Sequence, residues 1–162
     1  MRNYSLVEER DIVLYNQMDM KLSLRHILIA DMVILDQLTN KVSAIGLFDL
    51  INIPFNKESS IISFSITAQL IFSEIPTEEK ISVKLQLLKP SGVLEKEVEM
   101  DFITKEVFMT DESPARLPLI VRFNAIEFKS EDAGNYSISI LVNGNKPEVD
   151  SIASFQLIKH TE

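Results

Sequence analysis

Residues 62–72 follow a strict alternation of apolar and polar side chains over most of their length. Ser63, Ser65, Thr67 and Gln69 separate the apolar positions, which are Ile62, Phe64, Ile66, Ala68, Leu70 and Phe72. Successive side chains of a β-strand point to opposite sides of the sheet, so the pattern places the apolar set on one face. The stretch predicts a strand with one buried face.

The same period of two recurs through the rest of the chain, at 81–87, 94–102, 117–125, 136–142 and 153–157. Lys89-Pro90-Ser91-Gly92 separates the first two of these runs, and Asn143-Gly144-Asn145 follows the fourth. Proline presets one turn dihedral and glycine tolerates positive φ. Both segments therefore predict turns between antiparallel strands.

Three irregularities modify this pattern. Ile126 and Phe128 are out of phase with 117–125, which a β-bulge near Ala125 would explain. Runs 27–35 and 42–53 predict a hairpin through 39–41, and Gly46 indicates a bulge or a close backbone approach. Because both faces of 27–35 are apolar, we expect this strand to be covered on both sides, with the N-terminal segment as a candidate cover.

About eight short strands with turn residues between them predict an all-β fold, an antiparallel two-sheet sandwich. A chain of 162 residues with 46% hydrophobic content suits one domain better than two. We expect that domain over 26–160, after an N-terminal extension over 1–25. Within the extension, residues 4–20 are compatible with an amphipathic helix, a strand or a loosely docked arm.

Charge and composition exclude several classes of partner and site. The formal net charge of −8 disfavours nucleic acid and anionic membranes as partners. The chain has no cysteine, which excludes disulfides and thiolate chemistry. Charged residues at 8–11 interrupt any signal-peptide core, and no apolar run is long enough to span a bilayer. We expect a cytoplasmic protein.

Asp132, Gly134 and Tyr136, followed by an alternating strand, resemble the corner between two late strands of immunoglobulin-like domains. The resemblance covers 117–158 and implies an antiparallel two-sheet immunoglobulin-like sandwich. It also implies a tyrosine corner, in which the Tyr136 hydroxyl bonds to upstream backbone, so that Tyr136→Phe would cost about 1 kcal/mol. The cysteine expected two residues later is Ile138, and the chain has no tryptophan.

A second resemblance covers residues 26–158. Its elements are Ile29-Ala30-Asp31, the segment 43–49 (SAIGLFD), the KPSG turn at 89–92 and the GNYSISILVNG segment at 134–144. Together they are similar to an uncharacterised bacterial family of small stand-alone sandwich proteins. The resemblance implies a bacterial cytoplasmic setting and no particular activity.

No catalytic, metal-binding or cofactor-binding residues are assigned, and we expect no enzyme. The two histidines, His26 and His160, lack the spacing of a metal or acid–base motif and are interpreted as surface or edge residues. Asp31 and Asp49 lie in apolar surroundings, and we interpret them as structural carboxylates with satisfied hydrogen bonds. No nucleophile-elbow motif surrounds any serine.

Acidic and apolar surface positions suggest other roles. Hard cations prefer oxygen ligands gathered from loops, and the candidates are Asp111-Glu112, Glu131-Asp132 and Asp150. A solvated acidic surface is the favoured interpretation of these residues. The stripe of Glu95, Glu97, Glu99 and Asp101 is typical of protection against edge pairing. Outward-facing Ile71, Leu88 and Leu141 suggest an apolar patch for a partner or for the N-terminal arm.

Three hypotheses about function therefore stay open. The first is a non-catalytic protein-binding or assembly module, whose partner is another protein or a second copy of the chain. The second is a calcium-dependent binding module that uses the acidic end loops. The third is a small-ligand carrier or an enzyme with an interior pocket around Asp31 or Asp49.

Overall fold

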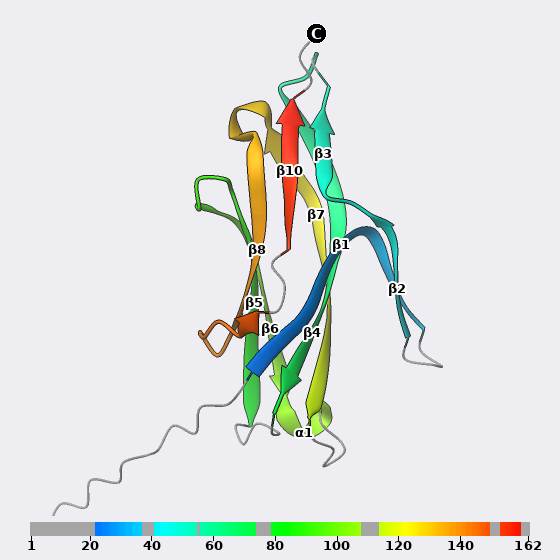
Figure 1. Cartoon of the computed structure of the whole chain (residues 1–162), viewed down its shortest axis with the longest axis vertical. Coiled ribbons are helices and arrows are strands. Elements are labelled where there is room, and N and C mark those ends of the chain that lie inside the picture. The colour runs from blue at the N-terminus through cyan, green and yellow to red at the C-terminus, as the bar shows by residue number, and fades with distance from the viewer. Residues whose placement is uncertain are drawn as a thin grey trace, which may run out of the picture.

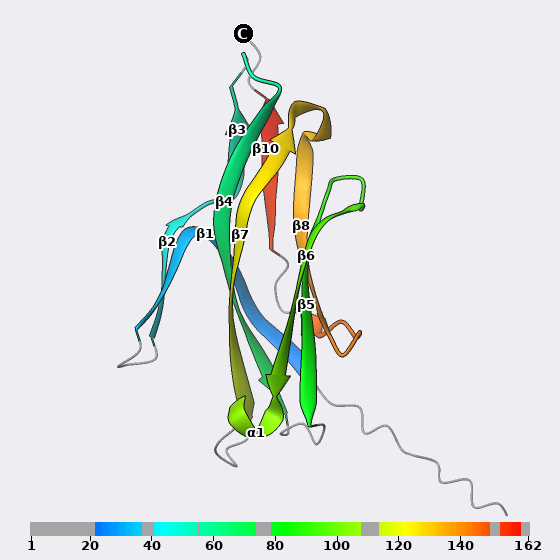
Figure 2. The same cartoon turned by 180° about the vertical axis from the view of Figure 1, so that it is seen from behind.

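Two β-sheets lie face to face in the computed structural model of this chain (Figure 1). The structure describes residues 22–36, 41–54, 56–73, 79–107, 114–149 and 153–159. One sheet has the strand order β2-β1-β4-β7, with β9 paired to β1, and the other has the order β3-β10-β8-β5-β6. Figure 2 shows the same two layers from behind.

The described residues form ten strands and two short helical turns. These are β1 (Leu22–Asp36), β2 (Lys41–Leu47), β3 (Leu50–Ile53), β4 (Ser59–Phe72), β5 (Lys80–Leu88), β6 (Leu94–Ile103), α1 (Thr104–Val107), β7 (Ala115–Lys129), the 3₁₀ turn η1 (Ser130–Asp132), β8 (Gly134–Val142), β9 (Glu148–Val149) and β10 (Ser154–Lys159). None of the described helices is long enough to cross a membrane.

The fold is the predicted two-sheet immunoglobulin-like sandwich, antiparallel except where β9 pairs with β1 and β3 with β10. β1, β4 and β7 pair in the order of strands A, B and E, while β10, β8 and β5 pair in the order G, F and C. β5 and β6 form the hairpin predicted from the KPSG turn, in which the Gly92 N–H donates to the Lys89 carbonyl oxygen at 2.8 Å. The period-two runs explain the two layers, since each sheet buries its apolar face against the other.

An aromatic cluster joins the two sheets at the centre of the core. The Phe64 ring, on β4, is fully buried. Its centroid lies 5.3 Å from that of Phe123 on β7 and 5.8 Å from that of Phe155 on β10. Phe155 in turn stacks on Tyr136 of β8 at 5.3 Å. The inward positions of four strands therefore meet in one cluster.

The bulge predicted near Ala125 is confirmed. The pairing of β4 with β7 shifts between Ile62 and Phe64, and Ala125 has a φ of +51°. The Ala125 N–H donates to the Ser63 hydroxyl oxygen at 3.0 Å, so the bulged backbone keeps a partner. The extra residue returns Ile126 and Phe128 to the inner face, where both are buried.

The first hairpin differs from the prediction in two ways. β1 and β2 do pair, but the run 42–53 is broken, because β2 ends at Leu47 and β3 begins at Leu50 in the other sheet, parallel to β10. The expectation that 27–35 is covered on both sides is wrong, because Leu28 in its first half and Met32, Ile34 and Leu35 in its second half are exposed. An apolar pattern on both faces indicates burial only where a second layer lies on each side.

The expected start of the domain, at residue 26, falls inside strand β1. This strand starts at Leu22, ahead of the expected domain start at 26, and both Leu22 and Leu24 are buried in the core. The proposed conformations of residues 4–20 fall outside the described residues.

Candidate functional site

The outer ends of β1 and β2 form a two-stranded arm that stands away from the two layers (Figures 1 and 2). We define the arm as Ala30–Asp36 of β1 and Lys41–Leu47 of β2, which pair antiparallel from Ala30 opposite Leu47 to Asp36 opposite Lys41. Among the described strands, β2 pairs only with β1. The pairing of β1 with β4 ends at Ala30, so within the described strands the arm is a ribbon that is open along β2 and along residues 31–36 of β1.

Large apolar side chains are exposed on both faces of the arm. One face carries Met32, Ile34, Ile45 and Leu47, and the opposite face carries Leu35 and Val42. Leu47 is 60% exposed and Ile45 is 52% exposed. Scattered single apolar residues are ordinary on a protein surface, whereas a contiguous apolar patch marks an interaction site.

A surface groove of about 420 Å³ lies at the root of the arm. Its lining includes Leu28, Leu47, Phe48, Asp49 and Ala153, so apolar side chains and one carboxylate face the same space. The groove forms where the chain leaves β2 for β3. The Phe48 N–H donates to the Ile29 carbonyl oxygen at 3.2 Å, which holds this crossover against β1.

Gly46 permits the close packing of the two strands of the arm. Its φ is +70°, and a Cβ atom at this position would overlap the Asp31 carboxylate of the neighbouring strand. The prediction for this glycine was a bulge or a close backbone approach; the group that lies close to it is the Asp31 side chain, and the pairing of β1 with β2 has no register shift. Asp31 itself is exposed on β1, and Asp49 is exposed at the groove. Neither carboxylate lies in an interior pocket of the kind that the third hypothesis requires.

The other candidate residues are dispersed. His26 is half-buried in β1 next to the register shift between Leu24 and Ile27. Ile71 lies on β4, in one sheet, whereas Leu88 and Leu141 lie on β5 and β8 in the other, so the three do not form one patch. All three are only partly exposed. His160, Asp111, Glu112 and Asp150 fall outside the described residues.

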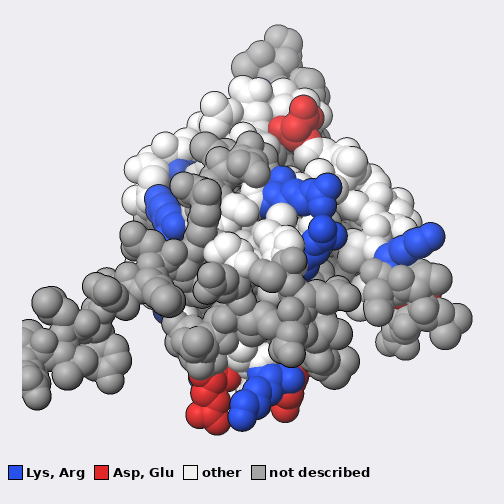
Figure 3. Space-filling model, turned by 60° about the horizontal axis from the view of Figure 1, so that its bottom comes forward, with Lys and Arg blue, Asp and Glu red and all other residues white. Residues whose placement is uncertain are grey.

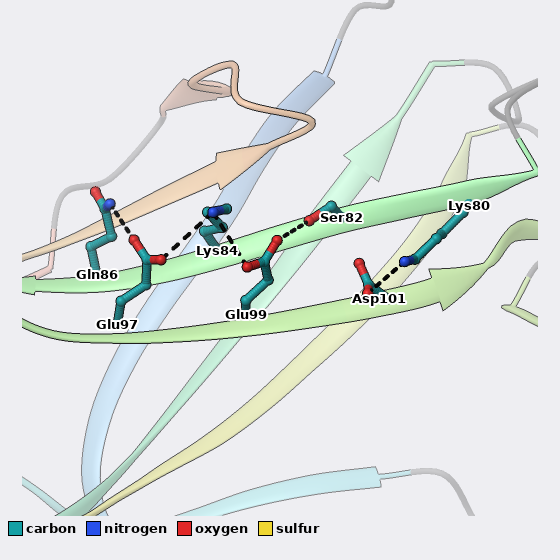
Figure 4. A network of polar contacts seen from close by, with 7 residues as sticks. All are labelled: Lys80, Ser82, Lys84, Gln86, Glu97, Glu99 and Asp101. Atoms are coloured by element: carbon teal, nitrogen blue, oxygen red, sulfur yellow. Dashed lines mark hydrogen bonds and ion pairs between the residues drawn. The ribbon is translucent and has the colours of Figure 1, made fainter.

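The acidic stripe of β6 lies on an edge strand and is largely neutralised (Figure 4). Lys80 contacts Asp101 at 2.7 Å, and Lys84 contacts Glu99 at 3.3 Å. The hydrogen bond and charge of Glu99 hold the pKa of Lys84 above its ordinary value. Further bonds join Ser82 to Glu99 and Gln86 to Glu97. This ladder of charges is a structural feature of the exposed face, where each pair contributes little.

The corner that the sequence singled out is clamped by the β5–β6 turn. Lys89 Nζ lies 2.8 Å from Asp132 Oδ2 and 3.1 Å from Glu95 Oε2. The bonds to these two carboxylates raise the pKa of Lys89, and the bond to Asp132 has the larger effect. A Cβ atom at Gly134 would lie 2.9 Å from the Pro90 ring. Asp132 is therefore engaged by an ammonium group, which disfavours it as a calcium ligand.

Among the described residues, the hydrogen bond expected of the tyrosine corner is not found. Tyr136 is 1% exposed and packs against Phe128 and Phe155, but within the described part of the chain its hydroxyl has no hydrogen bond. The ring, and not the phenol, holds this corner. Burial raises the pKa of Tyr136 to about 12, and the nearby Asp132 carboxylate adds to the rise.

The raised pKa of Tyr136 predicts that the protein loses stability in alkali. An unfolded chain ionises its tyrosines near pH 10, so the free energy of unfolding should fall between pH 10 and 12, by roughly 2 kcal/mol for this group. Tyr136→Phe should remove that part of the fall. At pH 7 the variant should lie within about 0.5 kcal/mol of wild type, because no bond is lost. Urea denaturation of both proteins from pH 7 to 11 measures this, and parallel curves would contradict it.

The remaining surface offers no strong site within the described residues. A second groove, of about 390 Å³, is lined by Glu58, Glu127 and Glu131, but also by Lys129 and Lys159. No group of three or more potential metal ligands was found in the described ranges. On the end shown in Figure 3, Lys and Arg lie in small separate groups, not in a continuous basic track. The arm is therefore the strongest candidate site.

Two solved structures are distantly similar to this chain. The Pseudomonas fluorescens alkylpurine DNA glycosylase AlkC, bound to DNA containing an abasic site analog, has 13% identity and a TM-score of 0.43; the match covers 86% of this chain and 31% of the glycosylase. A CARDB domain from Pyrococcus furiosus in complex with di-metal ions has 11% identity and a TM-score of 0.35, over 88% of both chains.

Comparison by sequence identifies a family. No curated protein matches the chain significantly. The model of a "Family of unknown function (DUF6941)" matches residues 25–152, which include the arm, the clamped corner and the part of the groove that β1 and the crossover line. This match spans most of the sandwich, from β1 to the segment after β9. The chain therefore belongs to the DUF6941 family of unknown function.

Proposed function

We propose that this protein is a non-catalytic protein-binding or assembly module that contacts its partner through the arm. The observation that carries the proposal is the exposure of large apolar side chains on both faces of a ribbon that stands clear of the sandwich. Exposing such a surface to water is unfavourable, because burying one Leu or Ile side chain lowers the free energy by about 1.5–3 kcal/mol. A partner that covers the arm would gain this free energy.

A protein partner suits the arm better than a membrane or a nucleic acid. The net charge of −8 opposes approach to anionic lipid and to phosphate backbones. Within Ala30–Asp36 and Lys41–Leu47, the charged residues are Asp31, Asp36 and Lys41, so the arm has no basic cluster for a lipid headgroup. A ribbon whose exposed large side chains are apolar, with its charges confined to Asp31, Asp36 and Lys41, matches the buried centre of a protein–protein interface.

The proposal includes a cytoplasmic, bacterial setting. The absence of cysteine supports a protein that does not depend on an oxidising compartment. The bacterial setting rests on the sequence resemblance of residues 26–158. The non-catalytic assignment rests on the chemistry of the arm, whose exposed side chains are mostly aliphatic.

Site-specific photo-crosslinking in cells tests this function. A photoreactive amino acid is introduced in place of Ile45 on the arm or, as the matched control, in place of Ile61 on β4, which is 70% exposed outside the arm. Position 45 should give a discrete adduct with a protein, identified by mass spectrometry. Position 61 should give none.

Two results would count against the proposal. One is the absence of a protein adduct at position 45, or equal adducts at both positions. The other is binding of the purified protein to phosphatidylcholine vesicles that Ile45→Lys abolishes, because the arm would then be a membrane-inserting element.

A further inference from the structure

We propose that the arm's partner is a second copy of this chain, joined by antiparallel pairing of β2 with β2 about a two-fold axis at Ser43. This inference rests on the proposed function and specifies its partner. The result would be one continuous sheet, with the order β7-β4-β1-β2 meeting its own copy at the β2 edge.

β2 is the unprotected edge strand of the described sheets. β9 is an edge strand of only two residues, and the second open edge of the arm, along Asp31–Asp36 of β1, begins and ends in a carboxylate. β6 carries the ladder of charged pairs along its length. β7 carries Arg116, Pro118 and Arg122 on its outward positions, and β3 has four residues followed by Pro54. Charges, proline and short length are the usual obstacles to edge pairing. Between Val42 and Leu47, β2 has none of these features.

The distribution of apolar side chains on β2 favours an occupant that lies along its edge. Ile45 and Val42 are exposed on opposite faces. A surface packed on one face would cover one of them and leave the other in water. A strand paired with β2 contacts both faces at once. Its alternate side chains lie beside those of β2, one set on each face of the sheet.

The same distribution identifies the chemistry of that strand. It must be apolar on both faces, free of proline and nearly uncharged, and β2 itself meets these requirements. Gly46, with its positive φ, limits the free pairing length to Lys41–Ile45. In a two-fold pair centred on Ser43, Lys41 lies opposite Ile45 of the partner and Val42 opposite Ala44. No like charges then face each other.

The expected dimer is weak. Five paired residues bury less than the roughly 1,600 Å² of a standard interface, so we expect a dissociation constant on the order of micromolar. Each copy carries a net charge of −8. Salt screens their repulsion, so the dimer should tighten as the ionic strength rises. A basic partner strand would give the opposite salt dependence.

Sedimentation equilibrium of the full chain at 50 and 500 mM NaCl tests the inference. The wild type should reach twice the chain mass with rising concentration, and more readily at high salt. Ile45→Lys should weaken the dimer at least about tenfold, since it removes apolar contact and faces Lys41 of the partner. Ile45→Glu should weaken it less, despite adding net negative charge, because it faces Lys41 with the opposite sign. Ile61→Lys should leave it unchanged.

A cysteine crosslink tests the register independently. The chain has no native cysteine, so Ser43→Cys provides one thiol per copy. Opposed residues of an antiparallel pair have Cα atoms about 4.5–5.5 Å apart, within the range that a disulfide spans. Mild oxidation should therefore give a covalent dimer, whereas Ser91→Cys, in the β5–β6 turn, should stay monomeric.

The inference is overturned by a monomer at every concentration, by a dimer that Ile45→Lys leaves intact, or by failure of Ser43→Cys to crosslink. If photo-crosslinking at position 45 still captures a different protein, the proposed function stands and only the identity of the partner is wrong. If neither a self-adduct nor a foreign adduct forms, both proposals fail.

Discussion

Phe64→Ala is expected to lower the free energy of unfolding by about 3–5 kcal/mol. The Phe64 ring is fully buried and contacts the rings of Phe123, Phe128 and Phe155, so it joins β4 to β7 and to β10 in the opposite sheet. Its removal leaves a cavity between two sheets that close packing prevents from collapsing. Chemical denaturation at pH 7 measures the change.

The control for this variant lies on the same strand. Ile61→Ala removes an exposed side chain of β4 and should change the free energy of unfolding by less than about 0.5 kcal/mol. A domain of this size has only about 5–15 kcal/mol of stability, so Phe64→Ala should remove a large part of it. A loss below about 2 kcal/mol would mean that the two sheets do not depend on this cluster.

Much of this architecture could be predicted from residue alternation alone. The inward apolar positions of β5 and β8, and those of β4 from Phe64 and of β7 up to Phe123, are buried, because a strand with one apolar face can bury that face in only one register. The bulge at Ala125 was predictable for the same reason. A single extra residue is the least disruptive way to return Ile126 and Phe128 to the core.

The arm could not be predicted in this way. An alternating pattern predicts which side chains are buried. It does not predict whether they are buried by the same chain or by a partner. The apolar positions of 27–35 therefore predict cover on both faces, whereas Met32, Ile34 and Leu35 are exposed. The pattern also did not predict the crossover at Asp49. Residues 42–53 look like one continuous run, but β2 and β3 on either side of the crossover belong to different sheets.

The corner illustrates a different limit. The sequence identified Asp132, Gly134 and Tyr136 and, separately, the turn at 89–92. It did not indicate that the two segments clamp each other, because Lys89 and Asp132 are 43 residues apart. The resemblance to immunoglobulin-like domains implied a hydrogen bond of the Tyr136 hydroxyl that is not found among the described residues. In the described structure the corner is held instead by the Lys89–Asp132 ion pair and by the Pro90 ring next to Gly134.

That clamp makes Gly134→Ala strongly destabilising, with an expected loss of about 3 kcal/mol in the free energy of unfolding. Gly134 has a φ of +143°, a conformation that side chains other than glycine rarely adopt. Its new methyl group would also lie 2.9 Å from Pro90 Cβ and Cγ. Urea denaturation of the variant at pH 7 measures the combined cost.

Gly144→Ala separates the two causes. Gly144 also has a positive φ, of +81°, but beyond its chain neighbours no atom lies within 4 Å of the place that a methyl group would occupy. Its substitution should therefore cost only about 1–2 kcal/mol for the backbone. The difference between the two variants measures the contact with Pro90. Pro90→Gly should reduce the cost of Gly134→Ala, because it removes the atoms that clash. Equal costs for the two glycines, with no effect of Pro90→Gly, would show that the turn does not clamp the corner.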